Sequence, residues 1–165
     1  MKEINIYDLK LNFNDFIRGF LVTSGNLESH NMLTAGWGNI GAFWSRPTMT
    51  VYIRKSRYTY QFIDNEEYFS CCFFDHKVHA NVLDVCGKES GRDVDKTKKC
   101  DLHPIELYNT VAFKEANLVI ICRKIHHFDI LEADFDDKNL GGKAYSDHDF
   151  HRGYIGEIVK AYVND

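Results

Sequence analysis

The sequence lacks the features that would divide it into domains or place it in a membrane. Only two prolines occur among 165 residues, and no run of glycine and serine marks a linker. No apolar run approaches the roughly 20 residues of a membrane-spanning helix, and residues 1–12 carry no secretory signal pattern. We therefore expect a single domain over residues 1–165, located in the cytoplasm and without a membrane partner.

The cysteines form no recognisable metal or redox motif. The chain has five of them, an odd number, and none is arranged as C-x-x-C. This argues against zinc-ribbon and thioredoxin-like proteins and favours reduced thiols in the cytoplasm. Cys71 and Cys72 are adjacent on an expected strand, so one thiol should face in and the other out. We interpret both as structural and expect no metal site.

An excess of basic residues is also missing. The formal net charge is −4, which argues against a nucleic-acid partner. An anionic ligand would have to bind a local cationic cluster, and the densest one lies at Arg54–Arg57.

Hydrophobic and aromatic residues are plentiful, at 44% and 14% of the chain. Such a composition, with β-branched stretches, predicts a packed and mainly β core. The expected strands are residues 19–25, 32–40, 48–54, 68–74, 117–125, 128–135 and 154–162. Helices are expected at 58–65 and 79–86, with a polar connection at 87–100. Many short strands with one or two helices predict a β-barrel with a few helices.

A basic turn follows the third expected strand, with the sequence Arg54-Lys55-Ser56-Arg57-Tyr58-Thr59. A helix start offers unpaired N–H groups and a partial positive charge, so a phosphate placed there gains hydrogen bonds and charge pairing. Arg54 and Arg57 would clamp its oxygens, while Ser56 and Thr59 supply hydroxyls. The alternative is a solvated surface turn in which Ser56 caps the helix.

A strand of small residues precedes this turn. Ala35 and Gly36 leave the backbone open to close approach by a flat ring. Redox flavins need backbone polar groups at the ring's polar edge and apolar surface at its other side. Thr34, Ala35 and Gly36 offer the first, and Met32, Leu33 and Trp37 the second. Alternatively, the small residues let another element pack closely.

Four motifs in order give the chain a resemblance to a known family. They are Asn31-x-Leu33-Thr34-Ala35-Gly36-Trp37-Gly38, Arg54-Lys55-Ser56-Arg57-Tyr58-Thr59, Ser90-Gly91-Arg92-Asp93-x-Asp95-Lys96 and His151-x-x-Tyr154-x-Gly156-Glu157. The pattern resembles the flavin reductase-like branch of the FMN-binding split-barrel proteins, which is flavoredoxin-like. The likeness runs from about residue 19 to 159.

The resemblance implies a six-stranded Greek-key barrel, a homodimer and bound FMN. It also implies electron transfer from NAD(P)H through the flavin to an acceptor. Residues implied to face the isoalloxazine are Asn31, Leu33, Thr34, Ala35, Gly36 and Trp37. Those implied at the phosphate are Arg54, Ser56, Arg57 and Thr59, in one turn with Lys55 and Tyr58. Ser90 and Gly91 would approach the flavin from a loop.

Residues 147–151 contain metal-ligand residue types, but such a stretch is typical of a solvated loop. His151 could instead stand over the flavin as a hydrogen-bond donor. No side chain needs to act as nucleophile or general base in flavin chemistry, so we assign no catalytic residue.

We thus expect an FMN-dependent NAD(P)H oxidoreductase. The alternatives are a non-enzymatic FMN-binding electron carrier reduced by a partner protein, and a structural barrel with an empty pocket. The aromatic content also favours a homodimer, in which Trp37, Trp44 and the region around His151 would contribute across the interface. The electron acceptor and the choice between NADH and NADPH stay open.

Overall fold

A computed structural model describes residues 1–164, and its fold is mainly β, as expected. The strands are β1 (Lys2–Ile4), β2 (Phe20–Gly25), β3 (His30–Ala35), β4 (Gly38–Phe43), β5 (Arg46–Arg54), β6 (Tyr68–Phe73), β7 (Pro104–Leu107), β8 (Thr110–Phe113), β9 (Leu118–Asp129) and β10 (His151–Val163). The helices are α1 (Phe13–Ile17), α2 (Tyr58–Asn65), α3 (His76–Lys88), α4 (Lys96–Lys99) and α5 (Lys138–Ala144), with 3-10 turns η1 (Ile6–Asp8) and η2 (Glu132–Asp134).

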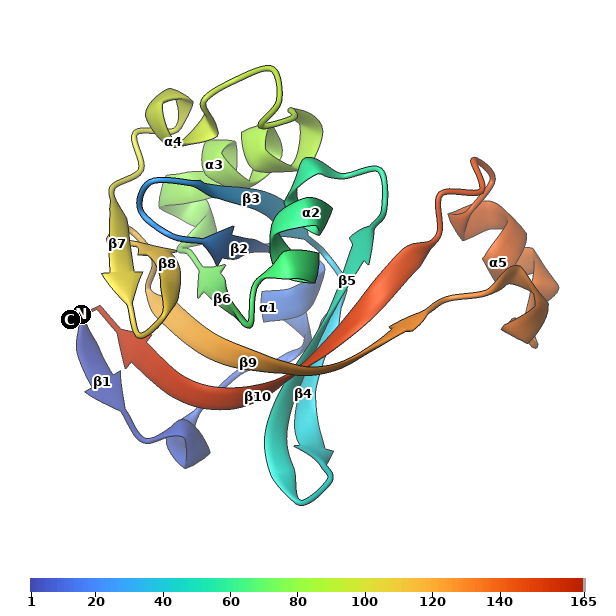
Figure 1. Cartoon of the computed structure of the whole chain (residues 1–165), viewed down its shortest axis with the longest axis horizontal. Coiled ribbons are helices and arrows are strands. Elements are labelled where there is room, and N and C mark those ends of the chain that lie inside the picture. Colours follow the sequence, from blue (N-terminus) through green and yellow to red (C-terminus); the bar gives the residue numbers. More distant parts are fainter. Residues whose placement is uncertain (165) are drawn as a thin grey trace.

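The main sheet is antiparallel and has the strand order β3-β2-β6-β9-β10-β5-β4, with β1 also paired to β10. The path from β3 to β5 contains the six strands expected of the barrel, and β1 and β4 are additions to it. In the part of the chain that the structure describes, no ladder joins β3 to β5. The sheet is therefore curved but open, which agrees with the split barrel expected from the sequence (Figure 1).

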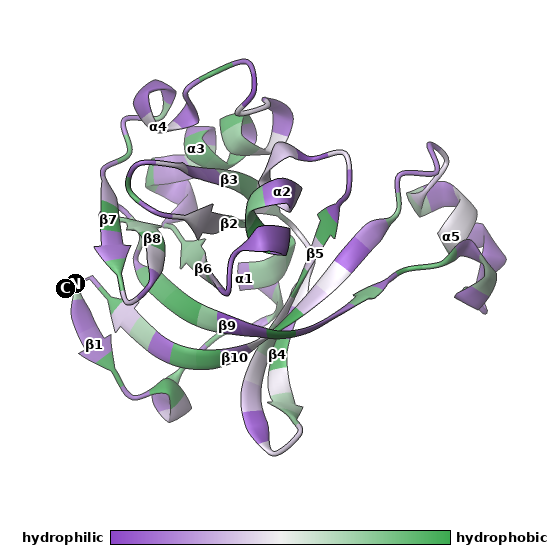
Figure 2. Ribbon diagram, in the orientation of Figure 1, coloured by the Kyte–Doolittle hydropathy of each residue, from purple (hydrophilic) through white to green (hydrophobic). Residues whose placement is uncertain are grey.

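Both faces of the central strands are buried. Phe69 and Cys71 of β6 pack in one hydrophobic cluster, whereas Cys72 packs in a second cluster beneath α3 and the β7–β8 hairpin. Cys71 and Cys72 do point to opposite sides, but both are fully buried. The expectation that one thiol would face out was wrong, because α3 and β8 cover the outer face of the strand. Figure 2 shows this hydrophobic band along β6, β8 and the first half of β9.

The expected strand at residues 32–40 is two strands. β3 pairs with β2, while β4 pairs with β5, so the chain changes partner at Gly36 and Trp37. The next turn is a two-residue hairpin at Trp44 and Ser45, where φ is +50° and +57°. α3 begins at His76, earlier than expected, because Asp75 accepts a hydrogen bond from the backbone N–H of Lys77.

The alternating segment 128–135 is not a strand beyond Asp129. β9 ends there, and η2 and α5 follow before β10 begins at His151. Residues 130–150, which we call the arm, project away from the barrel (Figure 1). Other short elements that were not expected are β1, η1, α1, the β7–β8 hairpin and α4. Within residues 1–164, none of the helices has the length and apolar character to cross a bilayer.

Candidate functional site

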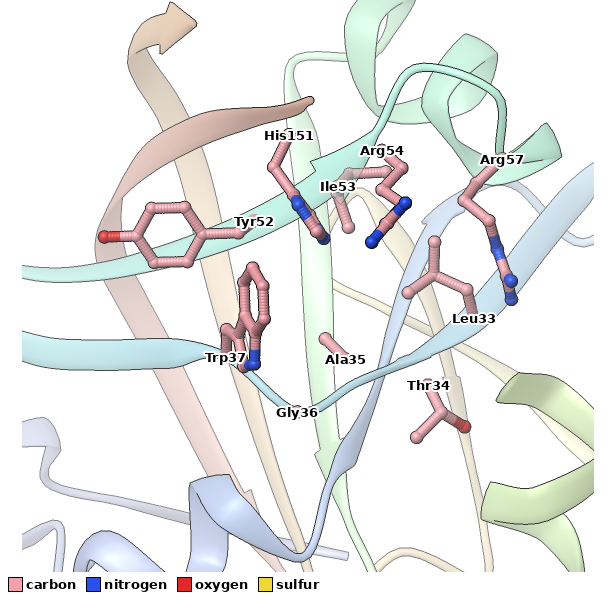
Figure 3. Close-up of a pocket in the computed structure, with 10 residues that line it drawn as sticks. All are labelled: Leu33, Thr34, Ala35, Gly36, Trp37, Tyr52, Ile53, Arg54, Arg57 and His151. Carbon is pink, nitrogen blue, oxygen red and sulfur yellow. The ribbon is translucent and has the colours of Figure 1, made fainter. Parts of the chain in front are cut away.

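Two adjoining cavities lie where β3, β5 and α2 meet. The first, the β3–β4 cavity, has a volume of about 210 Å³. Its lining consists of Leu33, Thr34, Ala35, Gly36, Trp37, Tyr52, Ile53, Arg54, Arg57 and His151 (Figure 3). The second, the α2 cavity, has a volume of about 120 Å³. Its lining consists of Asn31, Ser56, Arg57, Tyr58, Thr59, Lys88, Glu89, Ser90, Gly91, Arg92 and Lys96.

The partner change between β3 and β4 opens the first cavity to a ligand. Gly36 and Trp37 lie between the two ladders and have no strand partner in them, so their backbone N–H and C=O groups can bond a ligand. A Cβ atom added to Gly36 would meet nothing within 4 Å. The backbone at Gly36 is therefore open on this side, and that a flat ring occupies the space stays a prediction.

Trp37 and His151 form an aromatic wall of the same cavity. Their ring centroids are 4.6 Å apart, and the imidazole of His151 points into the cavity (Figure 3). Its Nδ1 lies 2.9 Å from the hydroxyl oxygen of Tyr145. Burial, followed by the positive charge of Arg54, lowers the pKa of His151 to about 4. This ring is therefore neutral at neutral pH.

The start of α2 faces the second cavity. Arg57 is the N-cap residue, and no side chain caps the first turn, so its N–H groups can bond an anion. Ser56 does not cap the helix, contrary to the alternative considered above. Thr59 is buried and accepts a hydrogen bond from Asn31 Nδ2 at 2.7 Å. A Cβ atom at Gly91 would overlap the side chain of Asn31, so only glycine lets this loop close on the cavity.

Arg57 and Lys96 are among the cations of the α2 cavity that have no acidic partner within ion-pair distance among residues 1–164. Arg57 donates to the carbonyl oxygens of Cys86, at 3.3 Å, and Gly87, at 2.6 Å. Lys96 is buried and donates to the carbonyl oxygens of Met32 and Glu89. Burial is the main cause that lowers the pKa of both groups. Asp149 and Glu89 act on these two charges only from beyond ion-pair distance, so both cations are suited to an anion.

The first half of the basic turn is bound by the arm and by the end of β9. Arg54 lies 2.6 Å from a carboxylate oxygen of Asp147. Ser56 donates its hydroxyl to Asp149 at 2.5 Å, and Lys55 Nζ bonds Asp129 at 2.7 Å. Of the residues expected at the cofactor, Lys55 and Met32 line neither cavity, and Met32 is instead buried in the second hydrophobic cluster.

Several lining residues were missed from the sequence. Lys96 belongs to the third motif but looked like one of many surface lysines, and only its burial distinguishes it. Arg92, in the same motif, lies over the ring of Tyr58 at 4.7 Å. Tyr52 and Ile53 directly precede the basic turn, and the alternation of β5 was their only signal. Within residues 1–164, no group of three or more His, Cys, Asp or Glu residues could hold a metal ion.

Comparison with known proteins identifies the family. The model of the flavin reductase like domain matches residues 18–165, and the chain belongs to this family. A search of curated protein sequences gives no significant match.

Solved structures with the same fold include two flavoredoxins and an NADH:FAD oxidoreductase. Flavoredoxin from Methanosarcina acetivorans is 25% identical, with a TM-score of 0.67 over 96% of this chain and 76% of that one. Flavoredoxin of Desulfovibrio vulgaris is 24% identical, with a TM-score of 0.67 over 89% and 69% of the two chains. The NADH:FAD oxidoreductase of Streptomyces globisporus is 13% identical, with a TM-score of 0.67 over 88% and 75%.

Proposed function

We propose that this protein is an FMN-dependent oxidoreductase that passes electrons from NAD(P)H to an acceptor. One observation carries the proposal: a cavity with open backbone adjoins the uncapped start of a helix, and Arg57 lines both. An aromatic ring fits the first environment and a phosphate the second. Membership of the flavin reductase like family supports the same ligand.

Different residues would hold the ring and the phosphate of the cofactor. Gly36 and Trp37 would offer backbone groups to the ring edge, and Leu33 and Ala35 apolar contact. The phosphate would lie at the start of α2, near Arg57 and Lys96. When bound, the flavin itself supplies hydride chemistry, so the chain has to bind, orient and exclude water. We accordingly still assign no nucleophile or general base.

FMN rather than FAD is the proposed cofactor, because the structure offers one compact site for phosphate. Within residues 1–164, the first turn of α2 has no side-chain cap, whereas Asp75 caps the neighbouring helix α3. Arg57 and Lys96, which have no acidic partner within ion-pair distance, line the same α2 cavity. Heat-released cofactor from the purified protein should comigrate with FMN on chromatography. Recovery of mostly FAD would overturn this part of the proposal.

Anaerobic mixing of the protein with NADH or NADPH distinguishes an enzyme from a passive electron carrier. The purified protein should be yellow, and NADH or NADPH should bleach its flavin absorbance in a single turnover. A yellow protein that neither nucleotide bleaches would instead be an electron carrier reduced by a partner protein. A colourless protein that binds no added FMN would contradict both functions. The rate with each nucleotide would also establish which one is preferred.

We further propose that the protein works as a homodimer in the cytoplasm. Trp37 and Trp44 are 44% and 53% exposed, and the β4–β5 hairpin that carries Trp44 projects from the barrel (Figure 1). A second copy would cover such surface and shield the cavity from water. Light scattering should return about twice the chain mass of 19.2 kDa. A species that stays at the single-chain mass with FMN bound would refute the dimer.

The proposed location in the cytoplasm is supported by the cysteines. All five are free and buried, which fits a reducing compartment.

A further inference from the structure

The arm carries one buried tyrosine whose hydroxyl contacts His151, a residue that lines the β3–β4 cavity. Tyr145 ends α5 and is 3% exposed, although most of the arm around it is exposed. Its hydroxyl oxygen lies 2.9 Å from Nδ1 of His151. We propose that Tyr145 is a positioning residue that holds His151 in one tautomer, with the proton on Nε2, as a hydrogen-bond donor to the ring of the cofactor. This inference rests on the proposed function.

The ring of Tyr145 is held from several sides. Phe150 stacks on it, with centroids 4.6 Å apart and planes inclined by 22°. The guanidinium carbon of Arg54 lies 5.6 Å from its centroid, and Trp37 meets it edge-on at 6.2 Å. These contacts leave the phenol little freedom to swing away from His151. The hydroxyl is consequently presented to the imidazole in a fixed direction.

The direction of the hydrogen bond follows from the two groups. A neutral imidazole has one nitrogen that donates and one that accepts. A phenol is a better donor than acceptor, so Tyr145 donates its O–H to Nδ1 and the proton of the ring stays on Nε2. Because Nδ1 is engaged, Nε2 is the nitrogen left for a ligand, and the ring points into the β3–β4 cavity (Figure 3).

The arm is anchored to the barrel by the residues that bind the basic turn. Asp147 pairs with Arg54, and Asp149 accepts from Ser56. Arg54 also donates to the carbonyl oxygen of Ala144, the neighbour of Tyr145, at 3.2 Å. Arg54 and Ser56, two of the four residues first assigned to the phosphate, thus hold the segment that carries Tyr145, and Tyr145 in turn holds His151. This gives the arm a role in the site.

A hydrogen-bond donor held in a fixed direction at His151 would change the reduction potential of the flavin. An N–H aimed at an acceptor atom of a flavin stabilises the electron-rich reduced ring more than the oxidised one, and so raises the reduction potential. A histidine of the other tautomer would present a lone pair there and have the opposite effect. Tyr145 would therefore tune the cofactor without contact with it.

The test removes the hydroxyl and keeps the ring, in Tyr145→Phe. Nitrogen-15 NMR of the histidines at neutral pH reports which nitrogen of His151 is protonated. The wild-type protein should show His151 protonated on Nε2. In the variant the tautomer ratio should shift about twofold to tenfold toward Nδ1, the worth of one hydrogen bond. The flavin potential of the variant should fall.

Tyr108→Phe is the matched control, because Tyr108 is a half-exposed tyrosine of the β7–β8 turn that packs on Tyr68. It should leave the His151 signals and the potential unchanged. A wild-type His151 protonated on Nδ1, or an unchanged ratio in Tyr145→Phe, would overturn the inference. A wild-type His151 protonated on Nδ1 would overturn the inference even if the variant does not fold. It needs no flavin, so a protein that binds none would refute the proposed function and leave this measurement valid.

Discussion

Arg54 and Arg57 stand three residues apart in one turn, yet their surroundings differ. Arg54 forms an ion pair with Asp147 and lies 3.8 Å from Asp149. Arg57 bonds only carbonyl oxygens, and no carboxylate lies within ion-pair distance of it among residues 1–164. The two arginines are alike in the sequence, but only Arg57 has a charge left for a ligand.

A cluster of cations in a sequence therefore predicts an anion site only where the fold brings no carboxylate into contact with them. Asp147 follows Arg54 by more than ninety residues, and the arm that carries it returns to the barrel only because β10 pairs with β5. In that ladder His151 lies opposite Arg54. The residues just before His151 are thereby brought over the turn and neutralise its first half.

Arg57→Ala should have the largest effect on the proposed FMN site. It removes a charge-assisted contact worth about 1.5–3 kcal/mol, so FMN affinity should fall roughly ten- to a hundredfold. Riboflavin, which has no phosphate, should bind almost as before. Fluorescence titration of both ligands checks this, with Arg57→Lys as a variant that keeps the charge. Equal losses for FMN and riboflavin would show that Arg57 supports the fold through Cys86 and Gly87.

Local patterns predicted the parts of the fold that depend on neighbouring residues. α2 lies at Tyr58–Asn65, as expected, because an extended Arg57 precedes it and its apolar residues follow a helical period. β2, β5 and β6 lie close to their expected ranges. The break at Gly36 was not predictable, since it depends on which strand each half pairs with. The arm was missed because an alternating sequence suits a strand only where a partner strand is available.

The sequence predicted many of the residues that line the two cavities, but not the tertiary contacts that bury Lys96 and Tyr145. The motifs placed Thr34, Gly36 and Arg57 around one pair of cavities, as the structure shows. The third motif ends at Lys96, but nothing in the sequence indicates that this lysine is buried, because its burial depends on how the loop after α3 folds over Met32. Tyr145 lies in a polar segment whose return to the barrel depends on the tertiary pairing of β10.

Gly91→Ala should disturb the packing of the α2 cavity. The added methyl group would overlap the side chain of Asn31 and disturb its hydrogen bond to Thr59. We expect a loss of about 1–2 kcal/mol in the free energy of unfolding, by overpacking and a weakened buried bond. Urea denaturation measures it. Gly142→Ala, where a Cβ atom meets nothing within 4 Å, is the control and should cost far less.

His151 should make stability depend on pH. Its pKa is about 4 in the folded protein against 6.5 ordinarily, so the unfolded chain binds the proton more readily between these values. Stability should therefore fall as pH drops from 6.5 to 4, by about 1 kcal/mol once solvent screening of a half-buried ring is allowed for. Denaturation of wild type and His151→Gln at pH 7 and pH 4 checks this. An equal fall in both would exclude His151 as the source.

Arg54→Ala should have the smallest effect on FMN and so completes the comparison with Arg57. Because the arm already neutralises Arg54, its loss should change the FMN dissociation constant less than about threefold, within the range of an exposed ion pair. The arm should loosen instead, since Asp147 loses its partner, and amide hydrogen exchange over residues 138–149 should become faster. Arg57→Ala should leave exchange there unchanged. If Arg54→Ala weakened FMN binding as much as Arg57→Ala, the arm would have to move aside when the cofactor binds, and both arginines would then contact the phosphate.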